Sequence, residues 1–303
     1  MNTTEQRNDV FTILTDRIIE QLEKQIVPWR KPWTEAGHPQ NLLTRLPYRG
    51  INTWLLASLG YEQNYFLTWK QVKAIGGSVK KGEKGNIVVF WKKLAAEQET
   101  DSENKRAPKS LLRYYLVFNV AQCEHLPLSL HIRFTENIHK PITLCDEIVA
   151  RMPQCPTIKH NKDAAWYNAK TDTVSLPKQG AFTSAEAYYS TLFHELIHST
   201  GHQSRLNRKE IIDYASYGSE PYGIEELTAE IGACYLNSVS GIVNAEFDSS
   251  IAYIKAWIGE LRDDKRLIVY ASSRAQKAVD FILNIQATDQ AGEMVEQTLE
   301  EQA

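Results

Sequence analysis

The stretch His194-Glu195-Leu196-Ile197-His198 constrains this chain more than any other, because it has the spacing of a metal site carried on one helix. Residues four apart differ by only about 40° around a helix, so both imidazoles leave the same face and can bind one ion. Zinc is the usual ion, and the glutamate between the histidines is usually the general base for the zinc-bound water. The motif therefore predicts a zinc-dependent hydrolase with Glu195 as its base.

The residues around the motif predict the helix that it needs. Apolar side chains recur from Ala185 through Ile197, Ser184 can cap the start of this run, and Gly201 follows as a stop. A helix this apolar is expected to be buried, and polar side chains buried in it need partners. A shared metal ion would be a partner for the histidines.

A zinc ion needs a third protein ligand, and the sequence offers two routes to it. One is the pattern H-E-x-x-H-x-x-G-x-x-H, but Ser204 stands where that pattern has its last histidine. The other is a carboxylate on a second helix, predicted over 223–236, where Glu226 and Glu230 lie four apart on one face. The third ligand is therefore expected from this second helix.

The order Glu-Leu-Thr-Ala-Glu that begins at Glu226 resembles the Glu-x-x-Ala-Asp helix of zincins with a glutamate ligand. That resemblance implies that Glu226 completes the site with His194 and His198. It also implies that Glu230 orients His194 through the other ring nitrogen, and Glu230 stays open as the alternative ligand. Glu225 fits an exposed acidic helix face. Mn²⁺ or Co²⁺ could occupy the same ligands as Zn²⁺.

Composition and charge indicate a cytoplasmic protein in two parts. The 303 residues are enough for two cores, no run near 18 apolar residues predicts a membrane span, and the polar start lacks a signal-peptide core. The four cysteines form no C-x-x-C pair, so we expect reduced thiols. Residues 1–125 carry 18 Lys and Arg against 13 Asp and Glu, whereas 126–303 carry 16 against 24. This asymmetry predicts different partners for the two parts.

The first part mixes lysines with aromatic residues, as is typical of proteins that bind single-stranded nucleic acid. Lysine and arginine neutralise phosphates, and exposed aromatic rings stack on bases for roughly 1–3 kcal/mol each. Trp54 and Trp69, set among leucines, are expected in the core, which leaves Trp29 and Trp33 as candidates for stacking. The expected DNA-binding residues are Trp29, Arg30, Lys31, Trp33, Arg49, Lys70, Lys73, Lys80, Lys81 and Lys84.

Three segments of this part carry a more specific resemblance. Pro-Trp-Arg-Lys-Pro-Trp at 28–33, Tyr-Arg-Gly-Ile-Asn at 48–52 and the Lys- and Gly-rich stretch 68–85 resemble the single-stranded-DNA-binding domain of the ArdC antirestriction family. With the histidine motif and the helix at 226–232, the resemblance extends to residue 286. It implies a protein encoded by a plasmid or other mobile element. Such a protein would accompany single-stranded DNA into a recipient cell and reduce its restriction by the host.

The expected fold is therefore of the α+β class. A small DNA-binding domain of helices and a sheet would span 1–125, a mainly helical zincin-like metallopeptidase domain 126–287, and a disordered acidic tail 288–303. Strands are expected at 86–92 and 114–120, a polar hairpin tip at 97–110, and a hairpin of 164–168 with 173–176.

Three functions are compatible with this organisation. The first is a metallopeptidase that cleaves a restriction enzyme subunit or another protein bound near DNA. The second is a DNA-binding shield or decoy that blocks restriction enzymes by docking and keeps a merely structural metal. The third is a metal-dependent nuclease, which the lack of a second acidic metal cluster disfavours. Glu195 favours the first, because a structural site needs no base there.

Overall fold

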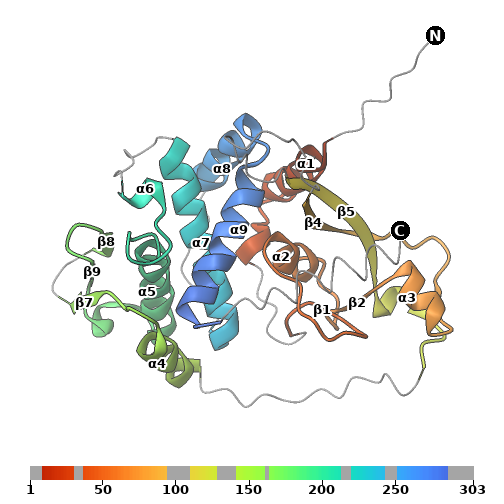
Figure 1. Ribbon diagram of the computed structural model, residues 1–303, viewed down its shortest axis with the longest axis horizontal. Coiled ribbons are helices and arrows are strands. Elements are labelled where there is room, and N and C mark those ends of the chain that lie inside the picture. The colour runs from red at the N-terminus through yellow and green to blue at the C-terminus, as the bar shows by residue number, and fades with distance from the viewer. Residues whose placement is uncertain are drawn as a thin grey trace, which may run out of the picture.

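Three long helices form the middle of the molecule: α5 (Ala185–Ser199), α7 (Glu220–Ser240) and α9 (Leu267–Ile282). Figure 1 shows small strands on both sides of them. The structure is a computed structural model that describes residues 9–30, 37–93, 110–127, 141–160, 164–212, 220–242 and 251–285. Helices and strands both build the fold, as expected of the α+β class.

The first part of the chain forms a four-stranded sheet with the strand order β1-β2-β5-β4. Its strands are β1 (Gln40–Asn41), β2 (Tyr65–Thr68), β4 (Asn86–Lys93) and β5 (Ser110–Asn119). β4 and β5 are antiparallel, with Val88 opposite Tyr115. Short strands β3 (Ser78–Val79) and β6 (Cys123–Glu124) pair separately. Three helices accompany these sheets: α1 (Val10–Glu23), α2 (Ile51–Ala57) and α3 (Trp69–Ala74), with the 3-10 turn η1 (Pro28–Arg30) after α1.

The second part adds a three-stranded sheet beside α5. It consists of β7 (Thr157–His160), β8 (Trp166–Asn168) and β9 (Thr173–Leu176) in the order β7-β9-β8. β9 runs parallel to β7 and antiparallel to β8, which confirms the expected hairpin. β8 is thus an edge strand among the described residues. Helices α4 (Pro141–Arg151), α6 (Lys209–Ile212) and α8 (Ile251–Asp263) complete this part.

The packing of α5 on α7 follows from caps and small residues. The Ser184 hydroxyl accepts a hydrogen bond from the backbone N–H of Ala187 and so begins α5 as the sequence predicts. On α7, a Cβ at Gly232 would lie 2.6 Å from Cδ1 of Ile197, a distance that real Cβ atoms do not show. Glycine therefore lets the two helices approach closely enough to share a metal site.

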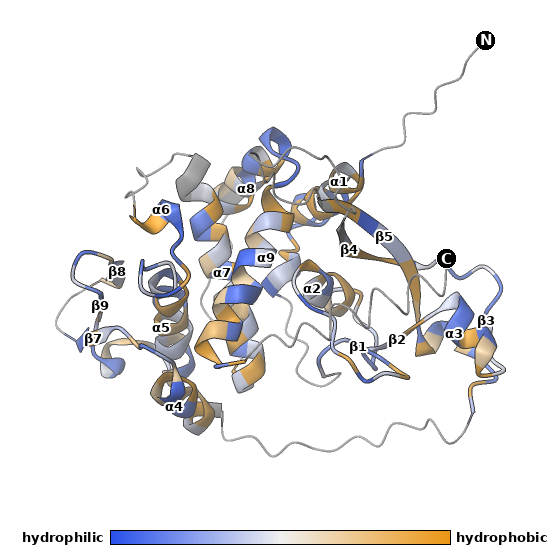
Figure 2. Ribbon diagram, viewed as in Figure 1, coloured by the Kyte–Doolittle hydropathy of each residue, from blue (hydrophilic) through white to orange (hydrophobic). Residues whose placement is uncertain are grey.

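One large cluster of buried apolar side chains joins both parts of the chain. It includes Leu14 and Trp54 from the first part and Phe193, Leu236 and Ile268 from the second. Figure 2 shows apolar residues on α2, α5, α7 and α9, which all contribute to this cluster. The proposed boundary at residue 125 thus separates two stretches of sequence that share a core, and it stays a prediction.

Several boundaries differ from those expected. β5 begins at Ser110 rather than 114. β1, β2, β3, β6 and β7 were not predicted, because each is short and, unlike β8 and β9, is not joined to its partner strand by a tight turn. The expected hairpin tip, apart from Ser110, and the tail 288–303 lie outside the described residues. Within the described helices, none combines the length and apolarity that a membrane crossing requires.

Candidate metal centre

The two histidines of the motif and Glu226 bring three donor groups together. Nε2 of His194 and Nε2 of His198 lie 3.1 Å apart, one helical turn from each other on α5. Glu226 on α7 places one carboxylate oxygen 3.6 Å from Nε2 of His194 and the other 3.5 Å from Nε2 of His198. Donor atoms of the three residues therefore surround one point between the helices.

These separations fit a single divalent transition metal. In a tetrahedral zinc site with metal–ligand bonds of about 2.0–2.1 Å, neighbouring ligand atoms lie about 3.3–3.4 Å apart. The two histidine nitrogens are 3.1 Å apart, each lies 3.5–3.6 Å from a different oxygen of Glu226, and one donor atom from each residue can be chosen so that all three lie within 4.8 Å. Two imidazoles and one carboxylate also form the donor set of many catalytic zinc sites, and the same donors accept Mn²⁺ or Co²⁺.

The buried carboxylate of Glu225 orients the ring of His198. Oε1 of Glu225 lies 3.1 Å from Nδ1 of His198, the ring nitrogen that faces away from His194. Arg208 in turn holds Glu225, donating from Nε to Oε2 at 2.8 Å and from Nη2 to Oε1 at 2.7 Å. Arg208 also donates to the Ile197 carbonyl near the end of α5. A metal-binding histidine commonly has such a partner, which fixes the ring and makes Nε2 more basic.

The same contacts set the protonation of the site. Burial alone would raise the pKa of Glu225, but the Arg208 guanidinium and His198 lower it to about 2. Burial alone would lower the pKa of His198, but its hydrogen bond to Glu225 and the surrounding glutamates raise it to about 9. A metal therefore has to displace a proton from His198 at neutral pH.

The donors open onto a cleft of about 390 Å³. Glu195 lines it beside the histidines and is only 7% exposed. Trp166 and Tyr167 of the edge strand β8 also line the cleft, as does Ile211 of α6. The cleft thus brings together a carboxylate, a metal-binding set and two residues of β8.

Glu225 and Glu230 both have roles other than those expected. Glu225 is 4% exposed and bonded to His198, whereas the sequence predicted an exposed position. Glu230 was expected to orient His194 or to replace Glu226 as ligand. Its Oε1 instead accepts hydrogen bonds from Nε1 of Trp29 at 2.9 Å and Nε of Arg30 at 2.8 Å. The helical step of about 100° turns Glu225 away from Glu226 and toward His198 and Arg208. Glu230 shares a face with Glu226 but lies about 6 Å further along α7, where Trp29 and Arg30 bind it.

Residues from both parts of the chain bind Glu230. Arg30 forms an ion pair with it at 2.7 Å, with only 11% and 7% of the two side chains exposed. The Tyr253 hydroxyl of α8 donates to Oε2 of Glu230, and the Arg30 guanidinium lies 4.4 Å from the centre of the Tyr253 ring. Arg30 and Trp29 are thus structural contacts between the two parts, not a DNA-binding surface.

The remaining expected DNA-binding residues fall into three groups. Arg49 forms an ion pair with Asp280 of α9, and Lys31 and Trp33 lie outside the described residues. The expectation for the tryptophans was wrong at two positions, since Trp29 is 0% exposed and Trp69 is 51% exposed. Five exposed lysines remain together, on α3 and in the turn after β3, and they are called the lysine surface here: Lys70, Lys73, Lys80, Lys81 and Lys84.

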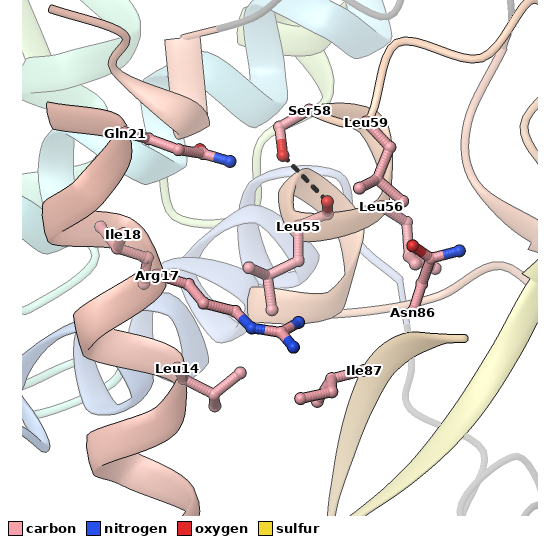
Figure 3. Close-up of a pocket in the computed structure, with 10 residues that line it drawn as sticks. All are labelled: Leu14, Arg17, Ile18, Gln21, Leu55, Leu56, Ser58, Leu59, Asn86 and Ile87. Carbon is pink, nitrogen blue, oxygen red and sulfur yellow. Dashed lines mark hydrogen bonds between the residues drawn. The ribbon is translucent and has the colours of Figure 1, made fainter. Parts of the chain in front are cut away.

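A second hollow lies between α1, α2 and β4, away from the metal centre. Figure 3 shows the Arg17 side chain reaching into it between Leu14, Leu55 and Ile87. Its other lining residues are mainly leucines and uncharged polar groups. Arg17 is the only charged group in this lining, so the hollow offers no acid–base pair or metal-binding set.

Glu225→Gln is expected to weaken metal binding about 10- to 100-fold, because the amide cannot stabilise the orientation and basicity of His198 as the carboxylate does. Competition with a chromophoric chelator would measure the dissociation constant. Glu210→Gln is the matched control, since Glu210 lines the same cleft but pairs with Arg274. Equal affinity for the two variants would contradict the role of Glu225.

Two family models match the chain. The model for the N-terminal domain of the anti-restriction factor ArdC matches residues 8–120, and the model for a zincin-like metallopeptidase matches residues 146–274. The metal-binding set on α5 and α7 falls within the second match, and the lysine surface falls within the first.

Solved structures and curated relatives agree with these matches. Crystal structures of the antirestriction protein ArdC from plasmid R388, one Mn(II)-bound and one metal-free, are 36% identical with TM-scores of 0.71. The chain covers 97% and 98% of them, and they cover 91% and 94% of it. Protein y4eC of Sinorhizobium fredii, described as uncharacterized, is 31% identical, with 96% of this chain and 97% of y4eC covered.

Two Escherichia coli proteins described as DNA primase TraC are 33% and 32% identical over 95% and 92% of this chain. The chain spans only 28% and 20% of their lengths. The likeness therefore concerns one portion of those longer proteins.

Proposed function

This chain belongs to the ArdC antirestriction family, and from that membership we propose that it binds single-stranded DNA entering a cell and hydrolyses peptide bonds in a protein of the host restriction system. The observation that carries the peptidase part is the set of donor atoms from His194, His198 and Glu226, which all lie within 4.8 Å of one another beside Glu195.

The residues of the cleft have distinct roles in this proposal. His194, His198 and Glu226 would hold Zn²⁺, or Mn²⁺ or Co²⁺ in its place, and the ion would supply Lewis-acid chemistry. Glu195 takes a proton from the attacking water and returns it to the leaving amine. Glu225 and Arg208 keep the His198 ring in its orientation.

Strand β8 suits the binding of an extended peptide. Among the described strands it pairs with β9 alone, and its residues Trp166 and Tyr167 line the cleft. A substrate segment can add to such an edge through backbone hydrogen bonds, which position a peptide bond without requiring a particular sequence. Arg205 holds the strand in place by donating hydrogen bonds to both Asp172 and the Tyr167 hydroxyl.

The test of the peptidase activity is cleavage of purified restriction subunits by metal-loaded protein, with and without single-stranded DNA. Metal-stripped protein is the control, and mass spectrometry of the fragments locates the cut. We expect fragments only from the metal-loaded protein and more of them with DNA, because DNA would bring enzyme and restriction complex together. Intact subunits under all four conditions would contradict the proposal.

The DNA-binding part of the proposal rests on the lysine surface. Changing Lys80, Lys81 and Lys84 to Ala is expected to weaken binding to an oligo(dT) strand and to lower the salt dependence, by up to about 2 in the slope of log K against log salt. Fluorescence anisotropy at several salt concentrations measures both quantities.

The matched control for this triple variant changes three exposed lysines of the second part to Ala: Lys159, Lys178 and Lys255. It removes the same charge from the whole protein but none from the lysine surface. If both triple variants had the same affinity and salt slope, long-range charge rather than this surface would govern binding.

A further inference from the structure

Trp69 has the largest exposed fraction among the tryptophans that the structure describes. It is 51% exposed, compared with 38% for Trp91 and Trp166 and 0% for Trp29 and Trp54. An indole left in water forgoes the stabilisation that burial of its apolar area would provide, at about 25 cal/mol per Å². Such a side chain on a basic surface is therefore a candidate for contact with a ligand.

The backbone that carries Trp69 is firmly held. The Thr68 hydroxyl accepts from the backbone N–H of Gln71, and the Gln71 side chain accepts from the Thr68 N–H, which forms a capping box at the start of α3. Nδ2 of Asn41 also donates to Oε1 of Gln71 at 2.9 Å. Gln71 and Val72 are the buried residues of this helix, and Val72 packs in a small core with Leu67. Trp69 is thus presented on a fixed support, which reduces the entropy lost when it binds.

Positive charge surrounds the exposed ring. Nζ of Lys73, one turn along α3, lies 4.9 Å from the centre of the Trp69 ring. Lys70 is exposed on the same short helix, and β3, which leads to the other three lysines, packs beside α3. Glu83, the single acidic residue between Trp69 and Lys84, accepts a hydrogen bond from Nε2 of Gln122. The ring therefore lies within the lysine surface.

We propose that Trp69 stacks on a nucleobase of single-stranded DNA while the lysine surface contacts the phosphates on either side. This inference deepens the proposed function and rests on its DNA-binding part. A paired base in a duplex hides both faces in the helical stack, so only an unpaired base can meet the indole. Trp69 then confers preference for single strands, whereas the lysines attract either form of DNA.

The other two half-exposed tryptophans lack this combination. The Trp91 ring already stacks on Tyr270, with centroids 6.1 Å apart and an interplanar angle of 25°, and it contacts Phe11 as well. Trp166 lies in the cleft of the metal centre. Trp91 is therefore the matched control for Trp69: it is a partly exposed tryptophan in the same part of the chain with a ring partner of its own.

The test compares binding of fluorescein-labelled oligo(dT) and of a duplex by full-length protein carrying Trp69→Ala, Trp69→Phe or Trp91→Ala. We expect Trp69→Ala to weaken single-strand binding about tenfold, to leave the salt slope unchanged and to leave duplex binding nearly unchanged. Trp69→Phe keeps an aromatic face and should lose less than about threefold. Trp91→Ala should bind as the parent does. Circular dichroism and thermal unfolding verify that each variant is folded.

The outcomes separate this inference from the function on which it rests. If Trp69→Ala binds oligo(dT) like the parent while the Lys80, Lys81 and Lys84 triple variant is weakened, single-strand binding stands and stacking on Trp69 is wrong. The inference is equally wrong if single-strand and duplex binding weaken by the same factor. If the parent itself fails to bind oligo(dT), the DNA-binding function and the inference both fall.

Discussion

Replacing Glu195 by Gln is expected to leave the fold and the metal in place and to slow hydrolysis by about 10²- to 10⁴-fold. The amide has the size of the carboxylate but cannot take a proton from water. Glu195 lines the cleft beside His194 and His198, yet it is not one of the three grouped donors. Its loss therefore removes proton transfer without removing a ligand.

Three measurements on the same preparation test this expectation. Elemental analysis gives the metal content, thermal unfolding gives stability, and cleavage of a restriction subunit gives the rate. Glu210→Gln, in the same cleft but paired with Arg274, should retain the parent rate. A Glu195→Gln protein that cleaves normally would contradict the role of base, and one that loses its metal would show that Glu195 acts in binding the ion.

Glu230→Ala is expected to lower the free energy of unfolding by about 3–5 kcal/mol. The change leaves the Arg30 guanidinium buried without its carboxylate and Nε1 of Trp29 without its acceptor. Both groups belong to η1, and Glu230 belongs to the helix that carries Glu226. For a chain of this size, the loss corresponds to a fall in melting temperature of roughly 10 °C.

The chain contains a matched surface pair for comparison. Glu23 of α1 and Arg262 of α8 also join the two parts, but their side chains are 51% and 58% exposed. Glu23→Ala should therefore cost less than about 1 kcal/mol. Thermal unfolding of both variants in the presence of a chelator measures the difference without a contribution from metal. Equal stability of the two would contradict a structural role for Glu230.

Metal analysis of Glu230→Ala and Glu226→Ala also distinguishes the two candidates for third ligand. Glu226 lies within 3.6 Å of both histidine nitrogens, whereas Glu230 is occupied by Trp29 and Arg30. We expect Glu226→Ala to lose the metal and Glu230→Ala to keep it. If Glu226→Ala kept the metal and Glu230→Ala lost it, Glu230 would be the third ligand instead of Glu226.

The parts of the site that depend on local spacing could be predicted from the sequence. The helix with both histidines, its Ser184 cap, the position of Glu226 on a second helix and the hairpin before α5 depend on residues a few positions apart. The close approach of α7 to α5 also depends on a single small residue, Gly232, which meets Ile197.

The parts that depend on distant partners could not be predicted. Glu225 is fixed by Arg208, 17 residues earlier, and Glu230 by Arg30, 200 residues away. Nothing in the spacing of the glutamates distinguishes these partners, and each glutamate on its own fits an exposed helix face. Arg208 was missed as a functional residue for the same reason.

The exposure of the tryptophans could not be predicted from their sequence neighbours either. Trp29 stands among arginine, lysine and proline, yet Trp54 packs against its ring edge-to-face and Glu230 bonds its nitrogen. Trp69 stands two residues after the buried Leu67, yet it begins a six-residue helix whose buried residues are Gln71 and Val72, and its own ring stays exposed. Neighbours in sequence indicated polarity, whereas packing against other elements determined exposure.

Protection of transferred DNA in living cells tests whether peptide hydrolysis underlies the antirestriction function. An unmodified plasmid would be transferred as a single strand into restricting recipients that contain either the parent protein or Glu195→Gln, at equal abundance and equal DNA affinity. We expect the variant to lose protection, with plasmid recovery falling to that of recipients without the protein. Full protection by Glu195→Gln would contradict the peptidase mechanism, and a DNA-binding shield that docks on the restriction enzyme would then replace it.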